Sequence, residues 1–206
     1  DMIKDTIAAH KRIIFNGNGY SDEWVAEAER RGLPNIKCMV DAVPALVKPE
    51  AVEIFEKHGV YTKAEMESRA EVMYETYSKT INIEALTMID MAKKQIVPAT
   101  IKYQTSLAES VNAIKAASSA VDTSVQEALM ADISTNLKDM YAALAHLEEV
   151  AGKAEAMEEG AEQGHYYHDV VFAAMDELRK PADKLEMLVA KSAWPFPSYG
   201  DLIFEV

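Results

Sequence analysis

The feature that most constrains this chain is a run of apolar residues spaced three and four apart between residues 123 and 150. The run consists of Val125, Leu129, Ile133, Leu137, Met140, Leu144 and Leu147. Residues three and four apart share one face of an α-helix, so the spacing predicts a long helix with one buried stripe. Similar periods span residues 62–114 and about 165–192. We therefore predict an all-α fold, an antiparallel bundle of long helices with short helices before it and an extended C-terminal tail.

Residues that start, bend or end helices divide this pattern. Ser21 is predicted to cap a short helix, because its side chain can accept a hydrogen bond from the first turn. Pro49 suits a first helical residue, which needs no backbone donor. Thr62 and Glu65 form a capping box at the start of the first long helix. Pro98 lies within the pattern of that helix and is predicted to kink or end it.

Further breaks are predicted along the second half of the chain. Residues 118–122 are expected to form a turn, the acidic stretch 152–164 with its glycines a loop or frayed helix end, and Pro181 a kink. Helix is excluded over Trp194-Pro195-Phe196-Pro197, because each proline favours extended backbone at the residue before it. We expect three regions: short helices over 1–61 that close off an upstream catalytic domain, a long-helix bundle over 62–193 and an extended apolar tail over 194–206.

The tail is too apolar to be left wholly in water. It carries Trp194, Phe196 and Phe204, and burying one such large side chain contributes about 1.5–3 kcal/mol. We expect these three side chains to anchor the tail on a helical surface. The alternative is disorder, which is common at chain ends.

Composition argues against several classes of function. Lys and Arg number 21 against 34 Asp and Glu, a net charge of −13, and such a surface repels nucleic-acid phosphates. No uninterrupted apolar stretch approaches the roughly 18–20 residues of a transmembrane helix, so no membrane partner is expected. Cys38 is the single cysteine. It cannot pair within the chain, and a reducing compartment, the cytoplasm, is expected.

His165 and His168 are weak candidates for metal ligands. They lie three residues apart on one predicted helix face, and Glu162 gives His165 the Glu-x-x-His spacing of di-iron bundles. Such a site needs two of these motifs and two further glutamates, and the sequence has one motif. The alternative is a helix start with solvent-facing histidines and packed tyrosines. No catalytic or cofactor-binding residue can be argued from spacing; the Asn-Gly-Asn-Gly stretch at 16–19 lacks the Lys-Ser/Thr pair of a phosphate loop.

The stretch between residues 81 and 91 is apolar on two sides. At 100° per residue, Ile81 and its helical neighbours fall on one arc with Met91 at its edge, while Ile83 lies with Leu86 on the other side. A helix that is apolar on two sides is buried on two sides. Either this helix is central in the bundle, or Ile83, Leu86 and Met91 dock on another subunit or domain.

Several separated strings of the sequence resemble glutamine synthetases. Residues 40–71, with a Gly-Val-Tyr-Thr element at 59–62, look like the C-terminal helices of that family. Three further strings are similar to type III glutamine synthetases, the large bacterial class: Ile14-Phe15-Asn16-Gly17-Asn18-Gly19-Tyr20-Ser21, Tyr77-Ser78-Lys79-Thr80-Ile81-Asn82-Ile83-Glu84-Ala85 and Trp194-Pro195-x-Pro-x-Tyr199-x-Asp201-Leu202. The resemblance runs from about Ile13 to the end, although residues 115–164 carry no matching motif.

The resemblance implies an enzyme that makes glutamine from glutamate, ammonia and ATP through γ-glutamyl phosphate, in a ring-shaped homo-oligomer. ATP and Mg²⁺ or Mn²⁺ are implied for that whole enzyme. The metal, ATP and ammonia motifs of the family match nothing in this chain, so no catalytic residue is carried over. Because the chain opens at Asp1 within a helical pattern, we expect it to be the C-terminal part of a longer protein and to be inactive alone.

The expected partners follow from the same resemblance. They are the upstream catalytic domain and the other subunits of the ring. The expected role of this chain is in folding and assembly, and regulation is a further option. The periodicity alone also permits a free-standing helical bundle that acts as a sensory or adaptor module.

Overall fold

The computed structural model of the chain describes residues 1–11, 14 and 16–204. Ile13 and Phe15, which belong to the resemblance near the N-terminus, lie outside the described residues, as do the last two residues of the predicted tail. The chain divides into two compact units, residues 1–42 and 43–206.

The first unit contains two short helices with exposed surfaces. Helix α1 spans Met2–His10 and helix α2 spans Asp22–Arg30, and neither has a buried residue. Ser21 caps α2 as predicted, since its hydroxyl accepts a hydrogen bond from the backbone N–H of Trp24. The helix ends before Gly32, which has a positive φ of 75°. Helix α3, Met39–Leu46, continues across the boundary into the second unit.

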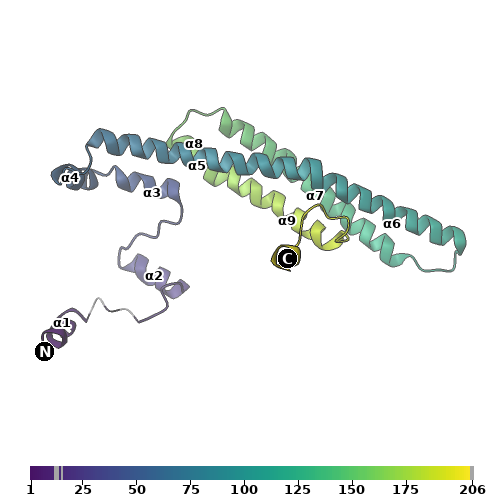
Figure 1. Cartoon of the computed structure of the whole chain (residues 1–206), viewed down its shortest axis with the longest axis horizontal. Coiled ribbons are helices and arrows are strands. Elements are labelled where there is room, and N and C mark those ends of the chain that lie inside the picture. Colours follow the sequence, from purple (N-terminus) through teal and green to yellow (C-terminus); the bar gives the residue numbers. More distant parts are fainter. Residues whose placement is uncertain (12–13, 15, 205–206) are drawn as a thin grey trace. The chain divides into compact units, whose positions relative to one another are not determined.

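The second unit is an antiparallel bundle of long helical rods (Figure 1). After α4 (Pro49–Lys57), one rod is built from α5 (Lys63–Met91), a π-helical turn at Ala92–Ile96 and α6 (Val97–Ala117). Helix α7 (Ser124–Glu155) runs back along it. The last rod consists of α8 (Ala161–Tyr166), a second π-helical turn at Tyr167–Val171 and α9 (Phe172–Leu188). The predicted all-α bundle is therefore confirmed.

Local signals place the start of the bundle where the sequence predicted it. Pro49 is the first residue of α4, and Gly59 follows its end with a positive φ of 65°. Thr62 and Glu65 form both hydrogen bonds of a capping box at the start of α5. These contacts satisfy backbone donors that have no partner inside a helix.

Pro98 neither ends nor interrupts the first rod. In the π-helical turn before it, the backbone N–H of Val97 donates to the carbonyl of Ala92, five residues earlier, where an α-helix would bond to the residue four earlier. Pro98 then falls in the first turn of α6. A proline has no N–H to donate back into the rod, so the widened π turn lies where one backbone hydrogen bond is missing.

The predicted loop at 152–164 is wrong over most of its length. Helix α7 continues to Glu155, and α8 begins at Ala161, so only residues 156–160 connect the two rods. Val150, Ala151 and Ala154 are buried. They extend the apolar stripe of α7, and this packing outweighs the helix-weakening effect of Gly152, which costs roughly 1 kcal/mol.

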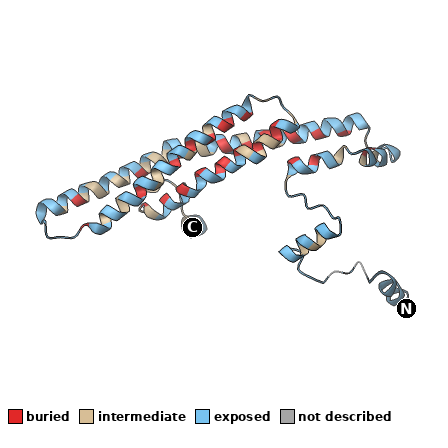
Figure 2. Cartoon of the chain, turned by 180° about the vertical axis from the view of Figure 1, so that it is seen from behind, coloured by how far each residue is buried: buried red, intermediate tan, exposed pale blue. Residues whose placement is uncertain are grey.

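The core lies along the facing sides of the rods (Figure 2). Its fully covered members come from all three rods and include Ala85, Ile133, Met140, Leu144, Leu147, Val171, Leu178 and Leu185. Pro181 lies inside α9 and is buried as well. Within the part of the chain that the structure describes, no helix is long and apolar enough to cross a membrane.

Candidate functional site

The outer side of α5 carries apolar side chains that no described residue of the chain covers. Ile83 is 65% exposed and Leu86 is 48% exposed, whereas Ile81 and Ala85 on the opposite side belong to the core. The two apolar sides inferred from the helical spacing therefore differ in this chain. One is packed in the bundle, and the other faces outward.

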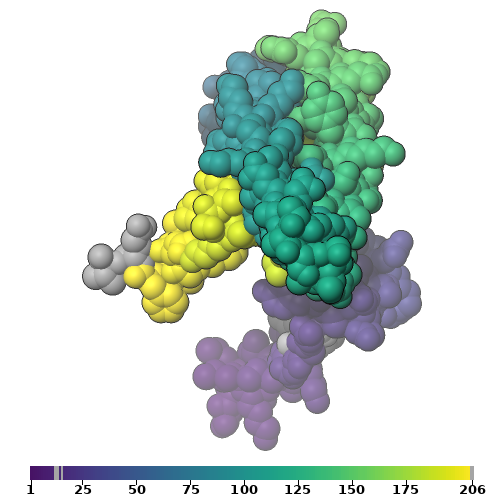
Figure 3. Space-filling view, turned by 90° about the vertical axis from the view of Figure 1, so that its right-hand side faces the viewer, coloured from purple at the N-terminus to yellow at the C-terminus, as the bar shows by residue number. Residues whose placement is uncertain are grey.

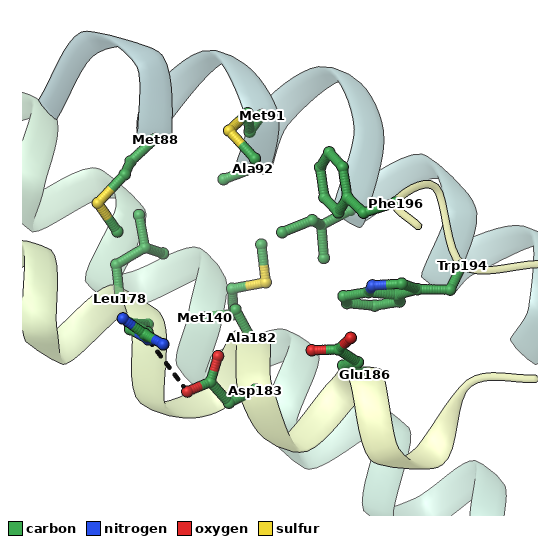
Figure 4. A pocket seen from close by; sticks show the side chains of 12 residues that line it. Met88, Met91, Ala92, Met140, Leu178, Ala182, Asp183, Glu186, Trp194 and Phe196 are labelled. Atoms are coloured by element: carbon green, nitrogen blue, oxygen red, sulfur yellow. Dashed lines mark hydrogen bonds and ion pairs between the residues drawn. The ribbon is translucent and has the colours of Figure 1, made fainter. Parts of the chain in front are cut away.

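Met91 does not share the surroundings of Ile83 and Leu86. It is half-buried and lines an apolar pocket of about 210 Å³ between the rods and the C-terminal segment (Figure 4). Two further methionines, Met88 and Met140, also line this pocket. The structure thus separates Met91 from the outward side, because it lies at the edge of the buried arc.

Trp194 and Phe196 close this pocket from the side of the C-terminal segment. Both pack against the core, and their rings meet edge to face with centroids 6.2 Å apart. Glu186 and the ion pair between Arg179 and Asp183 lie at the pocket as well (Figure 4). The segment after α9 is therefore fixed to the bundle by two aromatic side chains.

The predicted anchor Phe204 is not part of this contact. It is 79% exposed, and the segment beyond Phe196 is helical where an extended tail was predicted, with α10 spanning Tyr199–Phe204. Figure 3 shows the end of this segment (yellow) projecting from the bundle. The apolar side chains of α10 line one short helix that has no covering surface in the described part of the chain.

A helix start after Pro197 explains this difference. The backbone N–H of Ser198 donates to Asp201 Oδ2 at 2.8 Å, and the N–H of Asp201 donates to Ser198 Oγ at 3.3 Å. Asp201 also pairs with Lys191 at 2.6 Å. Both partners lower the pKa of the Asp201 carboxyl to about 2. The Ser-x-x-Asp pattern was the sequence signal for this capping box.

His165 and His168 lie on the last rod, with Tyr167 between them. Tyr167 is 2% exposed, and burial, followed by the charge of Glu155, raises the pKa of its phenol. His168 Nδ1 lies 2.7 Å from Asp169 Oδ1, and its ring is 6.4 Å from that of Tyr77. Among residues 1–11, 14 and 16–204, no group of three or more His, Cys, Asp or Glu side chains is placed to hold a metal ion.

A polar cleft between α5 and the end of α7 was missed by the sequence analysis. It has a volume of about 220 Å³ and is lined by Glu75, Ser78, Lys79, Asn82, Glu155, Glu159, Gln163 and Tyr167. The lining residues of α5 and those of the last rods are more than seventy positions apart in the sequence. Only the antiparallel pairing of the rods brings them together, so no local pattern could have revealed the cleft.

Comparisons with known proteins cover the whole chain. A family model described as the glutamine synthetase C-terminal domain matches residues 1–115. A glutamine synthetase of Butyrivibrio fibrisolvens is 39% identical over 206 residues, which are 100% of this chain and 29% of that protein.

Two further relatives extend this likeness. A type-3 glutamine synthetase of Dictyostelium discoideum is 29% identical, and a glutamine synthetase of Bacteroides fragilis is 30% identical. Each match covers 98% of this chain and 28% of the relative. The chain thus spans less than a third of the length of these relatives, and the likeness includes the region 115–164 where the sequence offered no motif. The chain belongs to the glutamine synthetase C-terminal domain family.

Proposed function

We propose that this chain is the helical C-terminal region of a type III glutamine synthetase, a cytoplasmic enzyme that ligates ammonia to glutamate with ATP. Support comes from the match of the whole chain to proteins of that name, of which it spans 29% in the first case. ATP and Mg²⁺ or Mn²⁺ belong, in this proposal, to a catalytic domain outside the 206 residues. Within the described residues the side chains offer no clamp of carboxylates for a metal, and the net charge of −13 disfavours ATP.

In this proposal the region contributes folding and assembly of the ring-shaped oligomer, and chemistry is done elsewhere. The observation that carries it is the exposure of Ile83 and Leu86 on a helix whose opposite side is packed in the core. Exposed apolar side chains grouped on one face are typical of a surface that another subunit or domain covers. By helical spacing the same face of α5 also carries Val72, and α6 has the exposed Ile101.

A double substitution tests this proposal. In the full-length protein, Ile83→Asp with Leu86→Asp is expected to shift the assembly toward smaller species and to lower glutamine formation with it, because each carboxylate would be buried unpaired. The measurement is the mass distribution by light scattering, with glutamine formation assayed on the same samples.

The matched control is Ser134→Asp, which adds a charge at an exposed position of α7. Normal assembly of the double variant would overturn the proposed contact and leave the family unaffected. Turnover of glutamate, ammonia and ATP by residues 1–206 alone would overturn the assignment of this region as non-catalytic.

A further inference from the structure

The polar cleft between α5 and the last rods contains buried acceptors without partners. Ser78 is 3% exposed, and its Oγ has no hydrogen-bond partner. Asn82 Oδ1, one helical turn further along α5, is also buried and unpartnered. Both side chains line the cleft. A buried polar atom left unpaired is unfavourable, so a cleft that holds two of them suits a ligand that donates hydrogen bonds.

The charge around these acceptors is negative. Glu75, Glu155 and Glu159 line the cleft together with Lys79, so three carboxylates and one ammonium group leave a formal charge of −2. The Lys79 ammonium is already bound to Glu75. A ligand that fits this cleft therefore carries positive charge as well as N–H donors.

The acidic lining continues beyond this cleft. A neighbouring cleft shares Glu75 and Glu159 and adds Glu71, two turns of α5 away from Ser78. Two adjoining clefts with carboxylates along one helix suit an elongated cation with charge at both ends. A bare metal ion fits less well, because no three acidic, His or Cys side chains of the described chain converge on a point.

The local backbone adds an independent sign of a binding site. The wall opposite α5 includes Tyr167, where the π-helical turn Tyr167–Val171 begins. Such turns are rare and are found frequently at functional sites. The buried Gln163 beside it is held by hydrogen bonds from its Nε2 to the carbonyls of Ala154 and Met157, at 3.1 and 3.5 Å. The wall is thereby preformed.

We propose that this cleft binds a small linear diammonium ion, one end of which donates hydrogen bonds to Ser78 Oγ and Asn82 Oδ1 while the other lies among the carboxylates of Glu71 and Glu159. The aliphatic chain between the two ammonium groups spans the adjoining clefts. Ile83 and Leu86 are not among the residues that line the two clefts, and occupation of the site requires no catalytic step.

Calorimetric titration of the full-length protein with 1,4-diaminobutane, at constant ionic strength set with NaCl, tests this proposal. We expect saturable binding and a rise in Tm. The Ser78→Ala, Asn82→Ala double variant is expected to bind about tenfold or more weakly, since it loses charge-assisted hydrogen bonds. Glu159→Gln is expected to weaken binding, and its neighbour Glu158→Gln, which is exposed and outside the cleft, is expected to bind as the unaltered protein does.

Three results would overturn the proposal. One is binding that is absent, or equally strong in the Glu158→Gln and Glu159→Gln variants. Another is tighter binding of Mg²⁺ than of the diamine at this site. The third is a crystal structure at saturating diamine in which ordered water alone occupies the acceptors of Ser78 and Asn82. If the double variant fails to fold by circular dichroism, the paired Glu158 and Glu159 variants decide the question.

Discussion

Helices α1 and α7 both carry apolar residues at helical spacing, but only α7 buries most of them, with Val125 near its start left exposed. In α1, Met2, Ile3 and Ile7 are 81%, 72% and 50% exposed, whereas α7 buries seven residues against its neighbours. The helices differ in length, with nine residues in α1 and thirty-two in α7. A nine-residue helix is marginal without tertiary packing. The pattern of apolar residues therefore identifies a helix, and the partners available in the chain decide whether it contributes to stability.

The largest expected effect contrasts one residue from each of these helices. Leu147→Ala removes a side chain that is 0% exposed, and should lower the free energy of unfolding by about 2–5 kcal/mol because it leaves a cavity. Ile7→Ala, in α1, should change the same quantity by less than about 0.5 kcal/mol. Urea unfolding followed by circular dichroism measures both. Equal losses would show that α1 is packed in solution.

The C-terminal segment offers the same contrast over a short distance. Trp194→Ala removes a half-buried ring from the core edge and is expected to cost about 1–3 kcal/mol. Phe204→Ala removes a ring that is 79% exposed and should have little effect. Hydrogen exchange of residues 190–204 should quicken only in the Trp194 variant. Faster exchange in both would place Phe204 in the anchoring contact.

Two helix caps extend the comparison to hydrogen bonds. Thr62→Ala removes the capping box of α5 and should lower global stability by about 1 kcal/mol. Ser21→Ala removes the cap of α2, where no residue is buried, and should only increase amide exchange within α2. A shift of the global unfolding midpoint by Ser21→Ala would show that α2 contributes to the global transition.

The smallest expected effects concern two partly buried carboxyls, those of Glu27 and Asp201. Hydrogen bonds and charge from Arg30 and Arg31 lower the pKa of Glu27 to about 2, and Lys191 with Ser198 does the same for Asp201. A carboxyl with a lowered pKa in the folded state stabilises the fold above its ordinary pKa, and this contribution is lost as the pH falls toward 2.

Carboxyl-carbon NMR titration measures the two groups separately. Lys191→Met is expected to raise the pKa of Asp201 toward its ordinary 3.8, and Arg30→Met that of Glu27 toward 4.5. Each substitution should leave the other carboxyl unchanged. An unaltered Asp201 titration in the Lys191 variant would show that the ion pair does not form in solution.

The parts of the structure that local rules control could be predicted from the sequence. The capping box at Thr62, the helix start at Pro49 and the apolar stripe of α7 each depend on residues within a few positions of one another. The ends of the connection between Glu155 and Ala161 could not be predicted in this way, because the burial of Ala154 depends on another rod. The cleft around Ser78 depends on register between rods for the same reason. The exposed Phe204 was misplaced because apolarity alone does not supply a covering surface.

The π-helical turns have a consequence for how chains of this family vary in length. A π turn accommodates one more residue than an α turn while the helix on either side keeps its direction. At Ala92–Ile96 the chain can therefore hold an inserted residue without rotating the core-facing sides of α5 and α6 away from α7. A relative with one residue fewer here is expected to have an unbroken α-helix with the same two flanks. Single-residue insertions and deletions are then absorbed inside the rod. An alignment that places the gap in a loop instead would misalign every residue between that loop and the π turn.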